Sequence, residues 1–266
     1  MKTLFNIQGE AAEQPEMLLL ELGVDQLKFA LYSREQDRFS HIRIYETNEF
    51  DMENDLLSIL NELSQRKVAN VMVCSSFPQA LLLPGFKTGD YSELFKNLFP
   101  EPVREIIKDD IPEWQMANVY ALPLEIHNQL ERSFPGLKFI HNFSCHLKNY
   151  NGFDHEDQIA IDFSTKHFRV MVKRQGKLEL AQIYSYVRPL DVVYYLLKIN
   201  SEMELDQSKV LLVLSGLVEQ DSAMYQVLHD YFSNIVFAAT GNTRFPDNDL
   251  PVHFFASIKN LAACAS

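Results

Sequence analysis

The sequence contains little cysteine and no long apolar segment. Among its 266 residues the cysteines are Cys74, Cys145 and Cys264, which are widely spaced and form no CxxC pair. An odd, scattered set excludes a disulfide framework and favours reduced, mostly buried thiols. The apolar runs are far shorter than the ~20 residues of a membrane-spanning helix, and polar residues between Asn6 and Glu10 interrupt any signal-peptide core. We therefore expect a cytoplasmic protein with no membrane insertion.

Positive charge is also scarce. The chain has 24 basic and 36 acidic residues, which gives a formal net charge of −12. Nucleic acid and anionic membranes are therefore poor partners, because both attract basic surfaces. The motifs GxSxG, GxxxxGK[ST] and GxGxxG are absent, so serine hydrolase, P-loop and Rossmann sites have no support. What is present is an ordinary globular composition, 47% hydrophobic and 23% charged, on a chain long enough for two domains.

The first half is predicted to alternate strands and helices after a polar, loosely held segment at residues 1–15. Apolar alternation indicates strands, and a 3–4 residue apolar spacing indicates amphipathic helices. A proline-bearing stretch at roughly 76–115 looks irregular, and its acid pair Asp109-Asp110 is expected on a solvated turn. The predicted elements are strands at 17–22, 27–31 and 42–44, a helix at 51–65, a strand at 68–74, a helix at 91–99, a strand at 119–122, a helix starting at Pro123 and a strand at 137–140.

The second half repeats this order after a linker at residues 149–152. Three antiparallel strands come first, and helices and strands then alternate to the end of the chain. The predicted elements are strands at 159–163, 168–172 and 178–184, a helix at 189–199, a strand at 210–214, a helix at 222–232, a strand at 235–238 and a helix at 252–263.

The two halves match at a fixed offset of 141 residues. Residues 18–31 lie over residues 159–172 without a gap, so that apolar residues meet apolar residues at every second position. The acids Glu21 and Asp162 fall in register, and the same offset superposes the later buried strands. Chance alternation in two amphipathic hairpins is the other explanation. A true repeat predicts an α/β protein in which each half has the order βββαβαβα.

This duplicated pattern resembles the actin-like ATPase fold, which joins two ribonuclease-H-like lobes of that order. It is nearest to the branch that holds the bacterial cell-division actin homologue and pilus-assembly PilM, where a subdomain is inserted after the first lobe's fourth strand. The terminal PVHFFASIKNLAAC resembles the closing helix of this branch, with Asn260 in place of a glycine. The chain also resembles an uncharacterised bacterial family of unknown function with this fold. The resemblance predicts a first lobe over 1–150 with an inserted subdomain at about 76–118, and a second lobe over 151–266.

The resemblance also implies where a nucleotide site would lie. In active members, three sequence motifs hold the phosphates, Mg²⁺ and adenosine. They are an acid followed by glycine and hydroxyl residues, then Asp-x-Gly-x-Thr, and then a glycine pair. Glycines let backbone N–H groups approach phosphate oxygens, and carboxylates hold Mg²⁺, usually through water. This chain departs from the pattern, because Val24 and Asp25 stand where hydroxyls would help and Phe163 replaces a small residue. The corresponding candidate residues are Glu21, Gly23, Asp162, Ser164, Thr165, Ser215 and Gly216.

These departures favour a non-catalytic adaptor or scaffold that binds a protein partner or peptide and keeps a degenerate nucleotide cleft, without cofactor or metal. The alternative is a nucleotide-dependent enzyme, an ATPase or small-molecule kinase working in the cleft between the lobes. It would use Asp162 as general base or metal-positioning acid, with ATP and Mg²⁺ as cofactors.

Two other clusters invite a functional interpretation. The first contains His141, Cys145, His146 and His155, which could hold a metal, although adjacent side chains tend to point apart and structural roles are favoured. The second is a set of aromatic residues in or beside the insertion, which forms either a small satellite core or a patch for a partner peptide. Its members are Phe77, Phe86, Tyr91, Phe95, Phe99 and Trp114.

Overall fold

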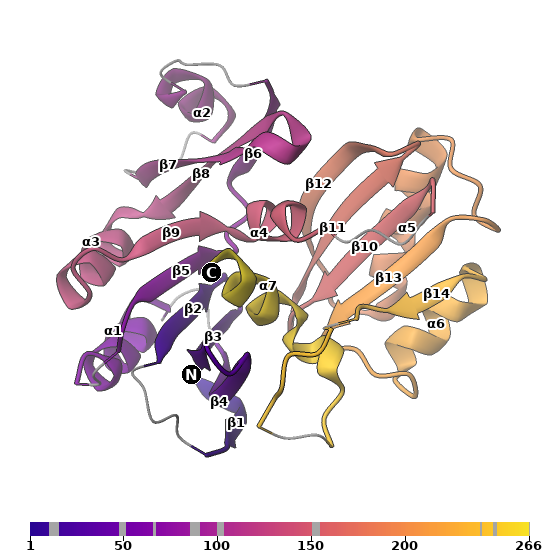
Figure 1. Cartoon of the computed structure of the whole chain (residues 1–266). Coiled ribbons are helices and arrows are strands. Elements are labelled where there is room, and N and C mark those ends of the chain that lie inside the picture. Colours follow the sequence, from indigo (N-terminus) through magenta and orange to yellow (C-terminus); the bar gives the residue numbers. More distant parts are fainter. Residues whose placement is uncertain are drawn as a thin grey trace. The chain divides into compact units, whose positions relative to one another are not determined.

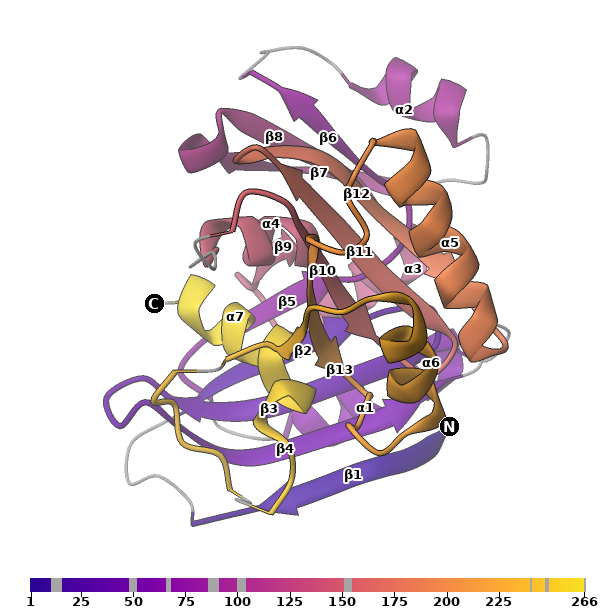
Figure 2. The same ribbon diagram turned by 90° about the vertical axis from the view of Figure 1, so that its right-hand side faces the viewer.

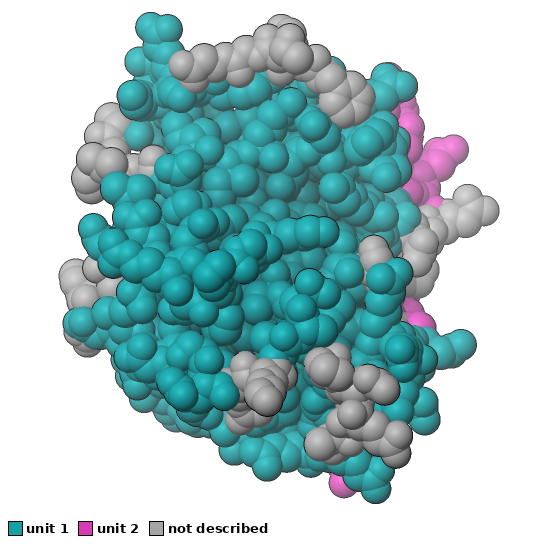
Figure 3. Space-filling model, turned by 60° about the vertical axis from the view of Figure 1, so that its left-hand side comes forward, with its two compact units in different colours: residues 1–150, 242–247, 258–266 teal, residues 151–241, 248–257 magenta. Residues whose placement is uncertain are grey.

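The chain folds into two compact units (Figures 1 and 3). Unit 1 comprises residues 1–150, 242–247 and 258–266, and unit 2 comprises residues 151–241 and 248–257. Asn151, Gly152 and Phe86, which the sequence analysis singles out, lie outside the described residues. The computed structural model describes residues 1–10, 16–47, 52–65, 68–85, 91–99, 104–150, 155–239, 241–246 and 249–265.

Unit 1 is built on a mixed six-stranded sheet with the order β1-β4-β3-β2-β5-β9. The first four strands in this order pair antiparallel, whereas β5 pairs parallel with β2, and β9 parallel with β5. The strands are β1 (Lys2–Gln8), β2 (Met17–Leu22), β3 (Gln26–Ser33), β4 (Arg38–Glu46), β5 (Val71–Ser75) and β9 (Lys138–His141).

Helices α1 (Met52–Leu63) and α3 (Leu124–Ser133) share a buried core with alternate residues of β2, from Leu18 to Leu22. Because successive strand residues point to opposite faces, Glu21 points away from this core. Helix α4 (Asn142–Lys148) contacts that second face, and most of α7 (Ala256–Cys264) belongs to the same unit.

The insertion in unit 1 forms a small antiparallel sheet with the order β6-β8-β7. Its own core contains Phe95, Val119 and Ala121, packed against partly buried neighbours that include Tyr91 and Phe99. The elements are β6 (Ala80–Pro84), α2 (Ser92–Leu98), β7 (Arg104–Ile111), η1 (Pro112–Trp114) and β8 (Met116–Pro123).

Unit 2 contains a five-stranded sheet with the order β12-β11-β10-β13-β14. Alternate residues of β10, from Ile159 to Phe163, form one core with α5 and α6. Helix α5 starts at Pro189, and the Asp191 carboxylate accepts a 2.8 Å hydrogen bond from the backbone N–H of Arg188, which caps the helix. The elements are β10 (Gln158–Phe163), β11 (His167–Arg174), β12 (Lys177–Ser185), α5 (Pro189–Glu202), β13 (Leu211–Gly216), α6 (Ala223–Tyr231), β14 (Ile235–Phe237) and η2 (Val252–Phe255).

The pairing register confirms the predicted repeat. Leu18 pairs with Leu31 across β2 and β3, and Ile159 pairs with Val172 across β10 and β11. Both members of the second pair lie 141 positions after their counterparts in the first. The parallel pairs β2–β5 and β10–β13 keep the same offset. Both sheets therefore contain the same five-strand topology, to which unit 1 adds β1 at its edge.

The prediction of a loosely held segment at residues 1–15 is wrong for its first part. Strand β1 runs along the outer edge of β4 in Figure 2. Backbone pairing with an exposed strand edge needs no apolar alternation, so the sequence pattern gives little sign of it. Asn6 helps to fix the strand, because its side-chain oxygen accepts a 2.9 Å hydrogen bond from Nε of Arg43 on β4.

The prediction of an irregular stretch is also wrong, since β6 and β7 lie within it. Two of its prolines, Pro84 and Pro112, stand at strand ends, where the missing N–H costs no ladder hydrogen bond. Asp109 and Asp110 lie in β7 rather than on a turn. They point to opposite faces, so Asp109 is buried while Asp110 is exposed.

Two helix predictions need correction. Helix α3 begins one residue after Pro123, which acts as its N-cap rather than its first helical residue. The short helix α4 is absent from the prediction, because seven residues carry too few turns for a clear period. In the part of the chain that the structure describes, no helix is both long and apolar enough to span a bilayer.

Candidate functional site

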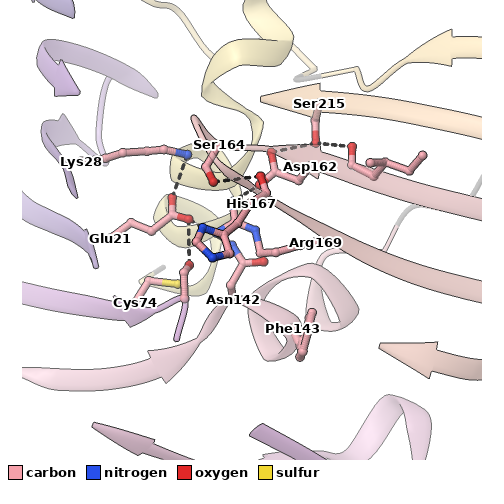
Figure 4. A network of polar contacts seen from close by, with 12 residues as sticks. Glu21, Lys28, Cys74, Asn142, Phe143, Asp162, Ser164, His167, Arg169 and Ser215 are labelled. Atoms are coloured by element: carbon pink, nitrogen blue, oxygen red, sulfur yellow. Dashed lines mark hydrogen bonds and ion pairs between the residues drawn. The ribbon is translucent and has the colours of Figure 1, made fainter. Parts of the chain in front are cut away.

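The candidate acid of unit 1, Glu21, is bound by a lysine on the neighbouring strand. Glu21 on β2 lies directly opposite Lys28 on β3, and Lys28 Nζ is 3.2 Å from Glu21 Oε2 (Figure 4). Both side chains are only 3% exposed. Ser76 Oγ donates to Glu21 Oε1 at 2.9 Å, and Asn142 Nδ2 donates to the same oxygen at 3.3 Å. The carboxylate is thus neutralised and hydrogen-bonded within its own unit.

The candidate acid of unit 2, Asp162, is bound in the same manner. Asp162 on β10 lies opposite Arg169 on β11, and the guanidinium is bonded to Asp162 Oδ2. Ser215 Oγ donates to the other oxygen, Oδ1, at 3.0 Å (Figure 4). The Arg169 and Asp162 side chains are 10% and 15% exposed, so this pair is less completely buried than its counterpart.

The two ion pairs are copies of one arrangement. Glu21 and Asp162 differ by 141 positions, and so do Lys28 and Arg169. In each unit the base follows the acid by seven residues and returns beside it across a hairpin with a two-residue tip. The acids were predicted as site residues and the bases were not, although the alignment of residues 18–31 with residues 159–172 already places Lys28 over Arg169.

The polar groups of the two hairpin turns form hydrogen bonds within the turns themselves. The backbone N–H of Gly23 donates to the Gln26 carbonyl at 2.9 Å, and the N–H of Ser164 donates to the His167 carbonyl at 2.9 Å. The Ser164 hydroxyl donates to that same carbonyl, also at 2.9 Å. Thr165 lies at the tip of the second turn and is partly buried.

Gly216, the candidate adenosine contact, is required by the packing of the sheet. It has a φ of +75°, and a Cβ atom on it would lie 2.1 Å from the Phe163 carbonyl oxygen and 2.7 Å from Asp162 Oδ1. The following residue, Leu217, donates its backbone N–H to that carbonyl at 2.9 Å. Only glycine fits at this position, whatever else it does.

The three residues that depart from the expected nucleotide-site pattern, Phe163, Val24 and Asp25, have contacts within their own units. Phe163 is 1% exposed and packs in the unit 2 core, with its ring 6.1 Å from those of Phe168 and Tyr186. Val24 packs against the unit 1 core. Asp25 is 4% exposed, and its carbonyl accepts a 3.0 Å hydrogen bond from the N–H of Thr47.

As they stand, the candidate residues do not fit a bound Mg²⁺. An acid that holds this ion, directly or through water, directs its oxygens at the ion or its waters. The oxygens of Glu21 and Asp162 are instead directed at lysine, arginine, serine and asparagine side chains of their own units.

The histidines that suggested a metal site have separate structural partners. His141 is completely buried, caps α4 by accepting from the N–H of Phe143, and lies 3.1 Å from the Phe77 carbonyl oxygen. His146 packs on Tyr150, and His155 belongs to unit 2. Among the described residues, no three His, Cys, Asp or Glu side chains are grouped as metal ligands would be.

A buried acid that the sequence analysis missed supports α4. Asp109 Oδ2 accepts a 2.8 Å hydrogen bond from the backbone N–H of His141, and the Tyr120 hydroxyl lies 3.4 Å from Oδ1. Burial raises the pKa of Asp109 to about 6, opposed by hydrogen bonds from Ser144 and His141. Burial likewise raises the pKa of Tyr120.

The aromatic residues of the insertion mostly pack inside the protein. Tyr91, Phe95 and Phe99 contribute to the small core of the insertion, and Phe77 belongs to the main core of unit 1. Trp114 donates its indole N–H to the Leu147 carbonyl at 3.0 Å. Tyr91, Phe95, Phe99 and Phe77 therefore contribute to cores, whereas Trp114 is partly buried and packs against Tyr150.

Two sheets of this shared topology, with an insertion in the first, define the actin-like ATPase fold. A protein with this fold and unknown function from Bacteroides thetaiotaomicron matches with a TM-score of 0.77 at 13% identity, covering 96% of this chain and 100% of that chain. The PilM–PilN type IV pilus biogenesis complex matches with a TM-score of 0.57 at 12% identity, covering 94% and 98%. The ethanolamine utilization protein EutJ from Carboxydothermus hydrogenoformans matches with a TM-score of 0.51 at 9% identity, covering 96% and 92%.

At these identities the structural matches show the fold alone. The chain itself belongs to the family described as "Protein of unknown function (DUF3822)", whose model matches residues 9–235. No curated protein matches the sequence.

Proposed function

We propose that this protein is a non-catalytic adaptor or scaffold with the actin-like fold, which binds a protein partner and retains a degenerate nucleotide site. The observation that carries the proposal is the duplicated ion pair. Glu21 is bound to Lys28, and Asp162 to Arg169. An acid that positions Mg²⁺ or an attacking water must direct its oxygens at that ion or water. Here the acid of each unit instead forms an ion pair with a base on the neighbouring strand of the same sheet.

The hairpin turns support the same proposal. A phosphate-binding loop presents several backbone N–H groups to the ligand, often from glycines. In both hairpins the first N–H of the turn, from Gly23 or Ser164, donates back within the turn. The Ser164 hydroxyl does so as well. These groups would have to break existing hydrogen bonds before they could bind a phosphate.

A protein partner is supported by an apolar surface at the start of α5. Val187, Leu190 and Tyr194 are 89%, 58% and 63% exposed. Leu190 and Tyr194 are four residues apart and lie on one side of the helix. Neighbouring exposed apolar and aromatic side chains are typical of protein contacts. PilM, a protein of similar fold, occurs in a complex with PilN, so such a scaffold is compatible with a protein ligand.

A nucleotide-dependent enzyme that uses Asp162 with ATP and Mg²⁺ remains the second candidate. One observation favours it, because the Asp162 side chain is 15% exposed and lies beside Arg169. A cation is therefore next to the acid and could turn to a phosphate oxygen if it left the carboxylate.

A ligand titration separates the two candidates. Thermal unfolding is measured for the wild type and for Asp162→Asn with millimolar Mg-ATP, with Mg²⁺ alone as the control. A ligand at 100 times its Kd would add about 2.7 kcal/mol to the stability. We expect no shift in either protein and no release of phosphate from ATP. A shift in the wild type that is lost in Asp162→Asn would overturn the proposal and favour the enzyme.

The partner surface is tested with a photo-reactive residue at position 194. Position 230, on the exposed side of α6, is the matched control. We expect a defined partner to crosslink from 194 but not from 230, and its affinity, measured with purified partner, to fall at least tenfold in Val187→Ser/Leu190→Ser. Equal crosslinking from both positions, or unchanged affinity, would contradict this surface.

A further inference from the structure

All three cysteines of the sequence come together in unit 1. Cys74 lies in β5, Cys145 in α4 and Cys264 at the end of α7. The Cys145 thiol is hydrogen-bonded to the thiols of both Cys74 and Cys264. Across 119 positions of the chain, Cys264 Sγ also lies 4.0 Å from the Cys145 carbonyl oxygen. The sequence shows only three widely spaced cysteines, and the nucleotide or adaptor function uses none of them.

The three thiols differ in access. Cys74 and Cys145 are each 1% exposed, so an oxidant in solvent does not reach them directly. Cys264 is only partly buried. The cluster thus has one partly buried thiol and, hydrogen-bonded to it, a fully buried one.

The surroundings of Cys264 stabilise its thiolate. Asn149 Nδ2 donates a hydrogen bond to Cys264 Sγ at 3.0 Å. The same amide donates to the Cys145 carbonyl at 2.8 Å, and this second bond fixes the orientation of the amide. The hydrogen bond from Cys145 is the main cause that lowers the pKa of Cys264, with Asn149 and the positive charge of Lys148 contributing. Burial raises the pKa of Cys145, which keeps that thiol protonated.

We propose that Cys264 and Cys145 form a peroxide-reactive dithiol, in which Cys264 is the attacking thiolate and Cys145 the resolving thiol. The Cys264 thiolate attacks one oxygen of a hydroperoxide, the O–O bond breaks, and the leaving alkoxide or hydroxide takes a proton from solvent. Cys264 is then a sulfenic acid. The Cys145 sulfur attacks the Cys264 sulfur, the S–O bond breaks, and the hydroxyl leaves as water with the Cys145 proton. The two thiols lose two electrons, which reduce one hydroperoxide.

The product would be a disulfide between α4 and α7, with both cysteines inside unit 1. Helix α4 also carries Asn142, which donates to Glu21 at 3.3 Å. One short helix therefore joins the thiol pair to the buried ion pair of the same unit.

The test uses the reduced, purified full chain and hydrogen peroxide. After a tenfold excess of peroxide the protein is alkylated in denaturant, digested without reductant and analysed by mass spectrometry. We expect one linked peptide containing Cys145 and Cys264, with Cys74 alkylated. Cys74→Ser is the matched control and is expected to form the same link. Cys145→Ser is expected to accumulate sulfenic acid at Cys264, trapped by dimedone.

A second measurement follows the rate of Cys264 oxidation against pH. In Asn149→Ala we expect a several-fold slower reaction at neutral pH and a pH profile moved upward, because the thiolate loses a donor. Three results would overturn the proposal: no linked peptide in the wild type, a link between Cys74 and Cys145 instead, or Cys264 oxidation no faster than that of free cysteine.

Discussion

The backbone of Gly216 lies so close to Phe163 that a Cβ atom on it would be 2.1 Å from the Phe163 carbonyl oxygen. We predict that Gly216→Ala destabilises the protein by roughly 4 kcal/mol or more, because β10 and β13 must separate to admit the methyl group. Gly176→Ala is the control, since Gly176 has a similar φ of +78° with nothing within 4 Å of a Cβ atom. It is expected to cost about 1–2 kcal/mol for the left-handed backbone alone. Thermal unfolding measures both, and equal losses would contradict the steric argument.

The buried pair of Glu21 and Lys28 leads to a second prediction. Lys28→Met leaves the Glu21 carboxylate without its cation in a site where both side chains are 3% exposed. We expect a loss of about 3–5 kcal/mol, because an uncompensated buried charge is costly. At roughly 2–4 °C per kcal/mol, the melting temperature should fall by about 10 °C.

The matched control for this prediction is the double variant Glu21→Gln/Lys28→Met. It removes both charges but keeps an acceptor for Ser76 and Asn142. Its stability should come within about 1–2 kcal/mol of the wild type, since a neutral pair no longer carries a buried charge. If the double variant loses as much as the sum of the single variants, the two residues are not coupled.

Asp109 gives a pH-dependent prediction. Its pKa is about 6 in the folded protein against an ordinary 3.8, so the folded state binds this proton more tightly than the unfolded chain. The stabilisation from Asp109 is therefore complete below pH 3.8 and is lost as the pH rises through 6. The difference corresponds to about 3 kcal/mol.

Asp109→Asn removes this titration and keeps an acceptor for the N–H of His141. The variant should match the wild type near pH 4 and be more stable above pH 6, by up to about 3 kcal/mol. Asp110→Asn is the control on the same strand. Its carboxylate is 57% exposed and paired with Lys108, so it should change stability by less than about 1 kcal/mol. Urea unfolding from pH 4 to 8 measures both variants, and parallel curves for Asp109→Asn and the wild type would refute the assignment.

Much of the fold could be predicted from the sequence because its signals are local. A compact apolar run marked β2, apolar alternation marked β3, and the offset of 141 residues marked the copies β10 and β11. The insertion was harder to predict, because its strand β8 is buried on both faces from Ala117 to Leu122 and therefore shows no apolar alternation. Strand β1 pairs through its backbone along β4, and a sequence pattern does not encode such pairing.

The candidate site was predictable in part. The repeat located Glu21 and Asp162. Lys28 and Arg169 were not predicted, because the family pattern for the site covers the hairpin loops and names no residue on the returning strands. Gly216 was identified as a possible ligand contact, and the structure adds a packing requirement that depends on the neighbouring strand. The meeting of Cys145 with Cys264 depends on tertiary packing between distant segments, for which hydrophobic periodicity carries no information.

The last prediction concerns the difference between the two copies of the ion pair. Arg169→Met should cost less than Lys28→Met, about 1–2 kcal/mol, because the Asp162 side chain is 15% exposed and keeps the hydroxyl donor of Ser215. Water can therefore solvate Asp162 after the arginine is removed. It cannot solvate Glu21 in the same way after the lysine is removed, because that side chain is only 3% exposed. The same reasoning predicts that 1 M salt weakens the Asp162 pair more than the Glu21 pair, since only the partly exposed pair is screened. Thermal unfolding of both variants at low and high salt tests this order, and a larger loss for Arg169→Met would mean that exposure does not set the strength of these pairs.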